Sequence, residues 1–345
     1  MRAVTYVSNG VVEVLDKPVP EISSDEVLVR VAGAGLCHSD LHIIHGGDDS
    51  PLVGQTLGHE VAGTVEQVGA DVTTVSVGER VLVALVYSCG SCRECLAGRD
   101  NLCWAAGGRD AVGPRSPGIG APGGMAEFIP VKAHNLDPIG DLDPVAAAPL
   151  ADAALTPMHA IETVRDRLTG DATVVVLGLG GLGHLALQLL AATCGSRLVV
   201  VDTDPVKLAA ALEHGADVAV PSDAAAAQRI LELTGGRGVD VVLDFVGVQP
   251  TVDLAIAVIA QGGAIRFAGL GGGSFTYAAA IGTIPWGVNI ERAYGGTRAE
   301  VRQIIGLAQA GKIAVDVKRY GLDDAPQAFV DLEAGKISGR AVLVP

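Results

Sequence analysis

A glycine-rich hexapeptide, GLGGLG at 178–183, constrains the fold of this chain more than any other feature. It follows a continuous β-branched run, 173–177, which is typical of a parallel strand buried on both faces. An Ala- and Leu-rich helix is predicted from about Gly181 to Cys194, and a second strand, 197–201, ends at Asp202. Strand, glycine turn, helix and acid in this order predict a doubly wound α/β domain.

The hexapeptide has the pattern of a phosphate-binding turn. Gly178 permits the tight turn, Gly180 lets the backbone approach a pyrophosphate, and Gly183 permits close packing of helix on strand. With Gly181 and Leu182 at the start of the helix, phosphates would lie on the helix N-terminus. GxGxxG alone is weak evidence, but its place between a strand and a helix indicates dinucleotide binding. A glycine turn without a nucleotide is the alternative.

The tip of the second strand indicates which dinucleotide is bound. Asp202 would accept hydrogen bonds from the adenosine ribose hydroxyls. Thr203 follows it, and no adjacent arginine could pair with a 2′-phosphate, so NAD is favoured over NADP. Lys207 is the nearby cation, and we expect it to contact the ribose.

Four clustered cysteines predict a structural metal site. Their spacing, C-x2-C-x2-C-x7-C, suits tetrahedral zinc with no open coordination position. An iron–sulfur cluster would share part of this spacing, but the chain lacks the nearby Cys-Pro, and polar residues interrupt the apolar shell such a cluster needs. The predicted ligands are Cys89, Cys92, Cys95 and Cys103.

A second metal signal comes from Cys37 and His59, about twenty residues apart, whose thiolate and imidazole suit one zinc ion. Ser39, Asp40 and His42 lie within five residues of the thiolate. The pair is weak evidence by itself, because Cys and His recur together by chance. It needs a third ligand and a redox cofactor site to indicate catalysis.

Composition bounds the class of protein. The 345 residues suffice for two domains, and 49% hydrophobic with 18% charged residues exclude wholesale disorder. A net charge of −15 disfavours nucleic acid and anionic membranes as partners. No apolar run reaches the roughly 18 residues of a spanning helix, and the N-terminus lacks a signal-peptide core, so we expect a cytoplasmic protein.

The pattern of hydrophobic residues changes near residue 150. Before it, short β-branched runs broken by Gly, Pro and Asp predict an irregular, mostly antiparallel barrel with a long surface loop at 105–124. A helix is predicted at 152–164, before the glycine loop. We expect three segments in all, namely a first domain at 1–150 that carries the cysteine loop 89–103, a Rossmann domain at 151–285, and a segment at 286–345 that returns to the first domain.

Together these motifs resemble the zinc-dependent medium-chain dehydrogenase/reductase family, and most closely its bacterial NAD-dependent secondary-alcohol dehydrogenases. The resemblance covers essentially the whole chain. It rests on GLCHSD at 35–40, LGHE at 57–60, GDLDPVAAAPLADAALTP at 140–157 and VLGLGGLGH at 176–184. It implies a GroES-like irregular β-barrel catalytic domain beside the Rossmann domain.

The resemblance also implies a catalytic zinc site. Cys37 and His59 match the first two ligands, and Asp152 falls where close bacterial members carry an Asp as the third. Three protein ligands leave one coordination position for water or substrate. The alternative for Asp152 is a helix N-cap before the predicted helix.

Further roles follow from the resemblance. Ser39 would bind the alcohol and start a proton relay through the nicotinamide ribose to His42, for which His45 is a rival. Asp40 would orient His59, and Glu60 would lie beside the zinc. The remaining implied cofactor contacts are His38 and Arg340 for the pyrophosphate, and Thr156, Val246, Leu270 and Gly271 for the nicotinamide.

The function implied is NAD-linked, reversible oxidation of an alcohol to a ketone or aldehyde, by hydride transfer from a zinc-bound alkoxide. A secondary or medium-sized apolar alcohol is indicated by candidate wall residues that are mostly apolar, namely Trp104, Ile119, Trp286 and Tyr294. The alternatives are a polyol or aldehyde dehydrogenase of the same superfamily, a zinc-free quinone reductase, and a non-catalytic NAD-binding protein. Two zinc ions per chain and a homotetramer or homodimer are also implied.

Overall fold

The computed structural model describes residues 1–107, 115–278, 282 and 284–345, and these form two compact units. The first unit comprises Met1–Leu155 and Gly295–Pro345. The second unit comprises Thr156–Tyr294. Within the described residues, no helix is long and apolar enough to cross a membrane.

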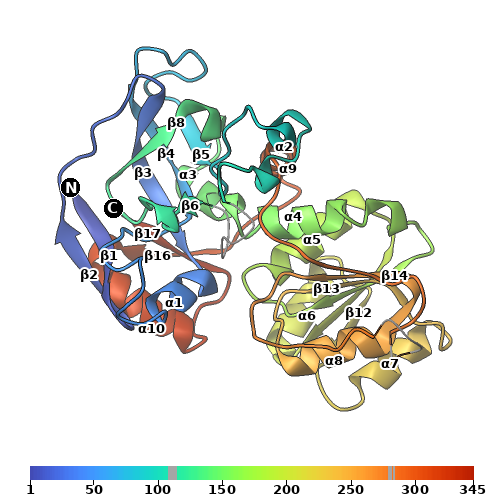
Figure 1. Ribbon diagram of the computed structural model, residues 1–345. Coiled ribbons are helices and arrows are strands. Elements are labelled where there is room, and N and C mark those ends of the chain that lie inside the picture. Colours follow the sequence, from blue (N-terminus) through green and yellow to red (C-terminus); the bar gives the residue numbers. More distant parts are fainter. Residues whose placement is uncertain (108–114, 279–281, 283) are drawn as a thin grey trace. The chain divides into compact units, whose positions relative to one another are not determined.

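The first unit is built on a mostly antiparallel sheet with strand order β16-β17-β3-β4-β5-β9, and β8 also pairs with β3 (Figure 1). β1 and β2 form a separate hairpin, and β6 and β7 a short pair. The bounds are β1 Arg2–Ser8, β2 Val11–Asp16, β3 Glu26–Leu36, β4 Glu60–Val68, β5 Arg80–Val83, β6 Ser116–Pro117, β7 Gly120–Ala121, β8 Phe128–Lys132, β9 Leu136–Pro138, β16 Val317–Gly321 and β17 Arg340–Val344. The alternating apolar residues of β3 and β4 face one core, which is why this half reads as short β-branched runs.

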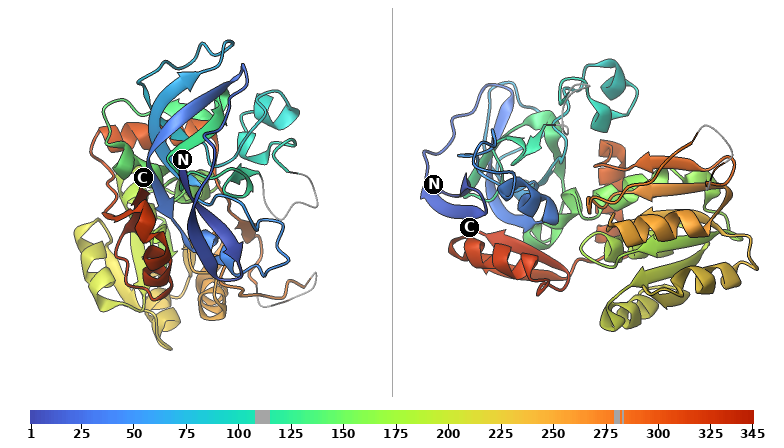
Figure 2. Two further views of the ribbon diagram at one scale, coloured as in Figure 1. Left: turned by 90° about the vertical axis from the view of Figure 1, so that its left-hand side faces the viewer. Right: turned by 60° about the horizontal axis from the view of Figure 1, so that its bottom comes forward.

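Short helices surround this sheet. They are α1 His38–Ile44, α2 Arg93–Leu96, α3 Pro144–Ala147, α9 Arg298–Gln309 and α10 Ala325–Glu333, with 3-10 turns η1 Asp100–Leu102, η2 Ala133–Asn135, η3 Ala148–Ala151 and η5 Leu322–Asp324. α10 packs against α1 and β2, as Figures 1 and 2 show. Its Phe329 and Leu332 are buried in the same core as Leu41 of α1.

The second unit is a six-stranded parallel sheet in the order β12-β11-β10-β13-β14-β15. In Figure 1, α4 and α5 lie on one side of this sheet and α7 and α8 on the other. The bounds are α4 Leu155–Glu162, η4 Arg165–Arg167, β10 Thr173–Leu177, α5 Gly183–Thr193, β11 Arg197–Asp202, α6 Pro205–Glu213, β12 Val218–Pro221, α7 Ala226–Leu233, β13 Val239–Asp244, α8 Gln249–Val258, β14 Ile259–Phe267 and β15 Asn289–Arg292. The predicted doubly wound α/β domain is confirmed.

The boundary predicted at residue 285 differs from the structure. β15 pairs in parallel with β14, with Ile265 opposite Ile290, so the second unit extends to Tyr294. The sequence predicts a strand near 289–294, but its polar, mostly exposed residues give no apolar run from which to assign it to the parallel sheet. Beyond it, β17 lies between β16 and β3, where Val342 is opposite Gly35.

Two local predictions also need correction. The segment at 105–124 is not a surface loop throughout, because Ser116, Pro117 and Gly118 are buried; residues 108–114 lie outside the described part of the chain. Gly118 and Gly123 of this segment make close contacts with the backbone of other segments. A Cβ on Gly118 would lie 2.7 Å from the Gly58 nitrogen, and one on Gly123 would lie 2.1 Å from the Leu57 oxygen.

The helix predicted at 152–164 is shorter than expected. η3 ends at Ala151, Asp152 lies outside any helix, and α4 begins at Leu155. Asp152 has φ −132° and ψ −55° and ends η3, so it is not the N-cap of α4. This removes the capping alternative for its carboxylate.

Candidate metal and nucleotide sites

Cys37 is held at the junction of β3 and α1. It is the N-cap of α1, where its Sγ accepts from the Ser39 N–H at 3.5 Å and its own N–H donates to Asp40 Oδ2 at 2.9 Å. This reciprocal capping box fixes the thiol at the start of the helix. Cys37 is 4% exposed, so its thiol faces the interior of the first unit.

His59 immediately precedes β4, after a tightly packed glycine. Gly58 has φ +97°, and a Cβ there would lie 2.6 Å from Met125 Cγ and 2.8 Å from the Met125 nitrogen. Only glycine fits this turn without displacing Met125. The imidazole that follows is 2% exposed.

Asp152 completes the cluster from a distant part of the first unit. Its Oδ2 lies 3.7 Å from Cys37 Sγ and 3.5 Å from His59 Nε2. Ligand atoms of Cys37, His59, Glu60 and Asp152 all lie within 4.8 Å of one another. The structure thus brings the three predicted ligands together.

The donor set fits zinc. Zinc–ligand bonds of about 2.0–2.3 Å at tetrahedral angles separate thiolate, imidazole and carboxylate atoms by roughly 3.3–3.7 Å, which is the observed range. His59 Nε2 is buried, and within the described residues it has no hydrogen-bond partner. A cation bound between the three side chains would satisfy this nitrogen and the two anionic ligands.

The charges around His59 also favour a cation. Although burial lowers the pKa of His59, the Asp40 carboxylate and then Asp152 raise it well above its ordinary value. Asp40 Oδ1 lies 3.3 Å from His59 Nδ1, and the Asp40 side chain is completely buried. Asp40 therefore lies where it can orient the imidazole, as expected of a carboxylate behind a metal-bound histidine.

Glu60 and Arg340 form a buried ion pair beside this cluster. Arg340 Nε donates to Glu60 Oε2 at 2.9 Å, and Nη2 donates to Oε1. Burial raises the pKa of Glu60 above its ordinary value, although the positive charge of Arg340 offsets part of this effect. Arg340 Nη2 also lies 3.8 Å from Asp152 Oδ2.

The predicted contact of Arg340 with a pyrophosphate stays a prediction beside this pairing. The residue is 3% exposed, and its guanidinium hydrogen-bonds Glu60. Sequence reasoning missed the pair, because its members are far apart in the chain.

The predicted relay residues lie on α1. Ser39 is half-buried, with its hydroxyl 3.6 Å from Cys37 Sγ. His42 is exposed one turn later. The rival, His45, is also exposed, and its Nε2 lies 3.2 Å from Glu333 Oε1. His38 is exposed at the first position of α1, and its predicted phosphate contact stays a prediction.

The four clustered cysteines converge in the loop around α2 and η1. Their sulfur atoms are 3.5 Å apart for Cys92–Cys95, 3.9 Å for Cys92–Cys103 and 4.0 Å for Cys89–Cys95. Tetrahedral zinc with bonds of about 2.3 Å would separate its sulfurs by about 3.8 Å. Hydrogen bonds from Ser91 and from the Cys92 N–H lower the pKa of the Cys89 thiol to about 5, which favours the thiolate that zinc binds.

The glycine loop of the second unit has the predicted geometry. Gly178 has φ +85°, where a side chain would be strained, and a Cβ on Gly183 would lie 1.8 Å from the Gly178 oxygen. Nothing lies within 4 Å of a Cβ on Gly180, so the backbone there is open to a ligand. Gly181 and Leu182 precede α5, which begins at Gly183.

Asp202 lies beside this loop at the end of β11. Its Oδ2 accepts from the Leu179 N–H at 2.6 Å, and its Oδ1 accepts from the Asp204 N–H at 2.9 Å. The carboxylate is thereby held at the carboxyl ends of β10 and β11, beside the glycine loop. Thr203 and Lys207 follow Asp202 in the chain and are exposed.

The predicted nicotinamide contacts are all in the second unit. Thr156 is buried in α4, while Val246 and Leu270 follow β13 and β14. Gly271, next to Leu270, donates its N–H to the Val246 oxygen at 3.1 Å. The structure thus joins the last three through backbone contacts.

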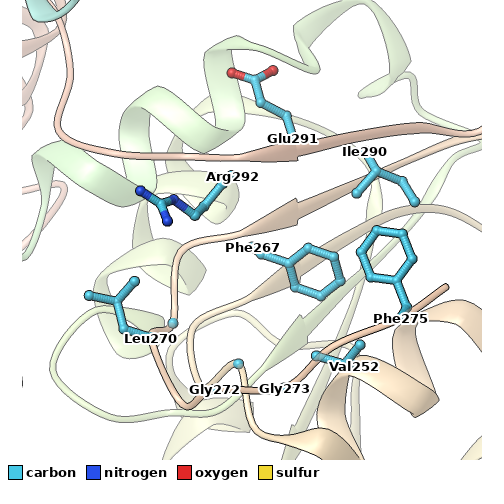
Figure 3. Close-up of a pocket in the computed structure, with 11 residues that line it drawn as sticks. Val252, Phe267, Leu270, Gly272, Gly273, Phe275, Ile290, Glu291 and Arg292 are labelled. Carbon is cyan, nitrogen blue, oxygen red and sulfur yellow. The ribbon is translucent and has the colours of Figure 1, made fainter. Parts of the chain in front are cut away.

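A pocket of about 490 Å³ opens beside these loops at the carboxyl ends of β14 and β15. Figure 3 shows Phe267, Phe275, Val252 and Ile290 at one side and Leu270 and Arg292 at the other. The two phenylalanine rings stack with centroids 6.0 Å apart. Leu270 is 51% exposed, so it is accessible at this edge.

The candidate substrate-wall residues are divided between the two units. Trp104 and Ile119 belong to the first unit, and Trp286 and Tyr294 to the second. Trp286 precedes β15, where its oxygen accepts from the Gly262 N–H at 2.8 Å. It therefore lies at the amino end of the sheet, opposite the glycine loop, and its role as a wall residue stays a prediction.

Comparison with known proteins gives the family. The chain matches the family model of the alcohol dehydrogenase GroES-like domain over residues 23–141, and that of the zinc-binding dehydrogenase over residues 181–310. A NAD-dependent alcohol dehydrogenase of Sulfurisphaera tokodaii is 33% identical to it over 100% of both chains. A D-arabinose 1-dehydrogenase (NADP(+)) of Saccharolobus solfataricus is 32% identical over 96% of this chain and 93% of that one.

A solved structure supports the same family. The alcohol dehydrogenase of the archaeon Aeropyrum pernix superimposes with a TM-score of 0.90 and 32% identity, over 100% of both chains. The chain belongs to the zinc-type medium-chain alcohol dehydrogenase family, as its motifs predicted. It is an oxidoreductase acting on CH–OH groups, with a GroES-like domain and a Rossmann domain.

Proposed function

We propose that the chain is a NAD-linked zinc alcohol dehydrogenase that interconverts a secondary or medium-sized apolar alcohol and its ketone or aldehyde. The observation that carries the proposal is the buried convergence of Cys37, His59 and Asp152 on one point. The three side chains come from separate segments of the first unit, and a purely structural role would not require an open set of three. A non-catalytic NAD-binding protein would have no use for this set.

The proposed chemistry divides between cofactors and chain. When bound, zinc supplies a Lewis acid and the nicotinamide supplies the hydride acceptor. Cys37, His59 and Asp152 hold the metal with two negative charges, and Asp40 fixes the ring of His59. Ser39 takes the proton from the substrate hydroxyl, and His42, three residues later on the same face of α1, delivers it to solvent.

The proposed cofactor site is the glycine loop with Asp202, Thr203 and Lys207. Asp202 carries a negative charge at the end of β11 beside the glycine loop, which suits ribose hydroxyls and repels a 2′-phosphate. NAD is therefore proposed over NADP. The two relatives differ here, since one is named NAD-dependent and the other NADP(+)-dependent.

A second candidate is a sugar or polyol dehydrogenase, which the D-arabinose 1-dehydrogenase relative favours. A polyol site needs buried polar groups to pair with the extra hydroxyls, so rejection of simple alcohols would be strong in such an enzyme. Comparison of kcat/KM for secondary alcohols and for pentoses decides between the two.

The test is a substrate panel with matched cofactors. The zinc-loaded enzyme is assayed with primary alcohols, secondary alcohols, diols and pentoses, with NAD and NADP in parallel, by the absorbance of the reduced nicotinamide. We expect the highest kcat/KM for a secondary alcohol with NAD. Oxidation of none of them by a protein that holds two zinc ions would overturn the proposal.

We also propose a homodimer or homotetramer located in the cytoplasm. β15 is an edge strand of its sheet, and the exposed Trp286 (75%) and Tyr277 (73%) lie in the segment before it. An edge strand next to exposed aromatic side chains suits pairing with a second copy. Six unpaired cysteines, four of them clustered, suit a reducing compartment. Light scattering of the purified protein tests the assembly, and a monomer would exclude it.

A further inference from the structure

A buried carboxylate at the end of β13 has no role in the sites described above. Asp244 is 0% exposed, so it cannot touch a bound ligand. Burial raises its pKa above the ordinary value, while the N–H groups of Gly247 and Val246 lower it. A buried carboxylate needs hydrogen-bond donors to offset its loss of hydration, and here the donors belong to the turn after β13.

The Asp244 side chain shapes the turn that follows β13. Its Oδ1 accepts from the Val246 N–H at 2.8 Å and from the Gly247 N–H at 2.9 Å. Its backbone oxygen accepts from the N–H groups of Ala268 at 2.8 Å and Gly269 at 3.0 Å, after β14. One residue thus ties together the loops at the carboxyl ends of two adjacent strands.

These two loops are packed too closely to move independently. A Cβ on Gly269 would lie 2.2 Å from the Val246 carbonyl carbon, and one on Gly247 would lie 2.2 Å from the Gly269 oxygen. Gly273 also donates to the Gly247 oxygen at 2.8 Å. Figure 3 shows Gly272 and Gly273 next to Val252 on the pocket side of the second loop. The shape of the first loop therefore sets that of the second.

The same turn meets the glycine loop. The Phe245 N–H donates to the Leu177 oxygen at 3.0 Å, which joins the turn to the end of β10. Val246 Cγ2 would lie 2.3 Å from a Cβ on Gly178, so its side chain packs directly on the first glycine. A displacement of the Val246 side chain would therefore change the space beside the glycine loop that a dinucleotide could occupy.

We propose that Asp244 is a positioning residue for dinucleotide binding: it holds Val246 against Gly178 and, through Gly269, the loop that carries Leu270. This deepens the proposed function and rests on the dinucleotide site alone, not on the identity of the alcohol. A displacement of about 1 Å in such a support can change binding or rate by about a hundredfold.

The test compares Asp244→Ala with Asp240→Ala. Asp240 lies at the amino end of the same strand, where its Oδ2 accepts from the Thr173 N–H at 2.8 Å. Both changes remove a carboxylate that accepts from the backbone, but only one faces the glycine loop. The zinc-loaded full chain is titrated with NAD, NADH and NADP by calorimetry, and KM and kcat are measured separately with thermal unfolding as a reference.

For Asp244→Ala we expect at least about a tenfold weaker Kd for whichever dinucleotide the wild type binds, with kcat at saturation changed by less than about threefold. Asp240→Ala should lower the unfolding temperature and leave Kd unchanged. Asp244→Asn keeps an acceptor at Oδ1 and should bind within about threefold of wild type.

Three outcomes would overturn the inference. These are unchanged Kd in Asp244→Ala, an equal loss in Asp240→Ala at equal stability, or a loss above about tenfold in Asp244→Asn, which would assign the effect to charge instead of positioning. The last variant decides the matter if Asp244→Ala does not fold. Wild type that binds no dinucleotide would overturn the proposed function itself, which separates the two failures.

Discussion

Arg340 and Glu60 form a two-point ion pair in the interior of the first unit, directly beside the predicted zinc ligands. Their side chains are 4% and 0% exposed, and the pair joins β17 to the first residue of β4. Glu60 follows His59 in the chain, so the pair also anchors the backbone next to a ligand. An ion pair in this position affects both the stability of the sheet and the charge around the metal.

Removal of the guanidinium should be strongly destabilising. Arg340→Ala leaves Glu60 buried without a counter-charge, which costs about 3–5 kcal/mol of unfolding free energy. The control is Arg319→Ala, whose partner Asp143 lies 2.7 Å away at the surface and which should cost less than about 1 kcal/mol. Denaturant titration measures both, and equal losses would contradict the buried-pair account.

Loss of the Cys37 thiolate should remove one of two zinc ions. Cys37→Ala is expected to lower bound zinc from two ions to one per chain and to reduce kcat/KM at least about a hundredfold, because a Lewis acid supplies several kcal/mol. Cys194→Ala is the matched control, since this cysteine belongs to neither cluster of the described residues. One zinc in the wild type, unaffected by Cys37→Ala, would exclude the two-zinc interpretation.

Removal of the Asp202 carboxylate should change cofactor preference. Asp202→Ala is expected to raise KM for NAD about ten- to a hundredfold, through lost hydrogen bonds to the ribose, and to raise KM for NADP much less. Asp204→Ala removes the N-cap of α6 only two residues away, at about 1 kcal/mol of stability, and should leave the NAD/NADP ratio unchanged. Equal increases in KM for both cofactors would instead indicate that Asp202 acts by holding the Leu179 N–H and not by binding the ribose.

Stability should depend on Asp240 in acid. Burial raises the pKa of Asp240, but its hydrogen bonds to Arg237 and to the Thr173 N–H lower it further, and the net pKa is lowered. A carboxyl with a lower pKa in the folded state stabilises the fold above its unfolded pKa of about 3.9, and this contribution disappears as pH falls through the folded pKa. The difference in unfolding temperature between wild type and Asp240→Asn should therefore shrink between about pH 5 and pH 2.

Arg237→Gln provides the control for this pH series. It removes the cation that lowers the Asp240 pKa, so its own difference from wild type should shrink over the same pH range. A constant difference at every pH would show that the Arg237–Asp240 pair does not titrate with the fold. Chemical denaturation at fixed pH gives the same comparison in free-energy form.

The sequence was most informative where a local pattern determines the structure. The predicted strand 173–177 has the observed bounds of β10, because a strand buried on both faces is apolar at every position. The glycine loop was equally readable, since Gly178 and Gly183 are required by backbone geometry within one turn. In short motifs of this kind, neighbouring residues alone determine the local structure.

Contacts between distant segments could not be read in the same way. Asp152 came from the family resemblance, since nothing in the spacing links it to Cys37. The partner of Arg340 depends on how β17 enters the sheet beside β3, which no local pattern specifies. The position of Trp286 at the amino end of the parallel sheet also depends on strand polarity, which no local pattern specifies.

The position of β17 between β16 and β3 has a consequence for biosynthesis. The sheet of the first unit receives this strand, and with it Arg340, only after the ribosome has released residues 340–344. The second unit, a continuous segment from Thr156 to Tyr294, can fold earlier on the nascent chain. Until Arg340 has been synthesised, the Glu60 carboxylate lacks its counter-charge. The metal pocket therefore reaches its final charge balance only after the second unit has been synthesised.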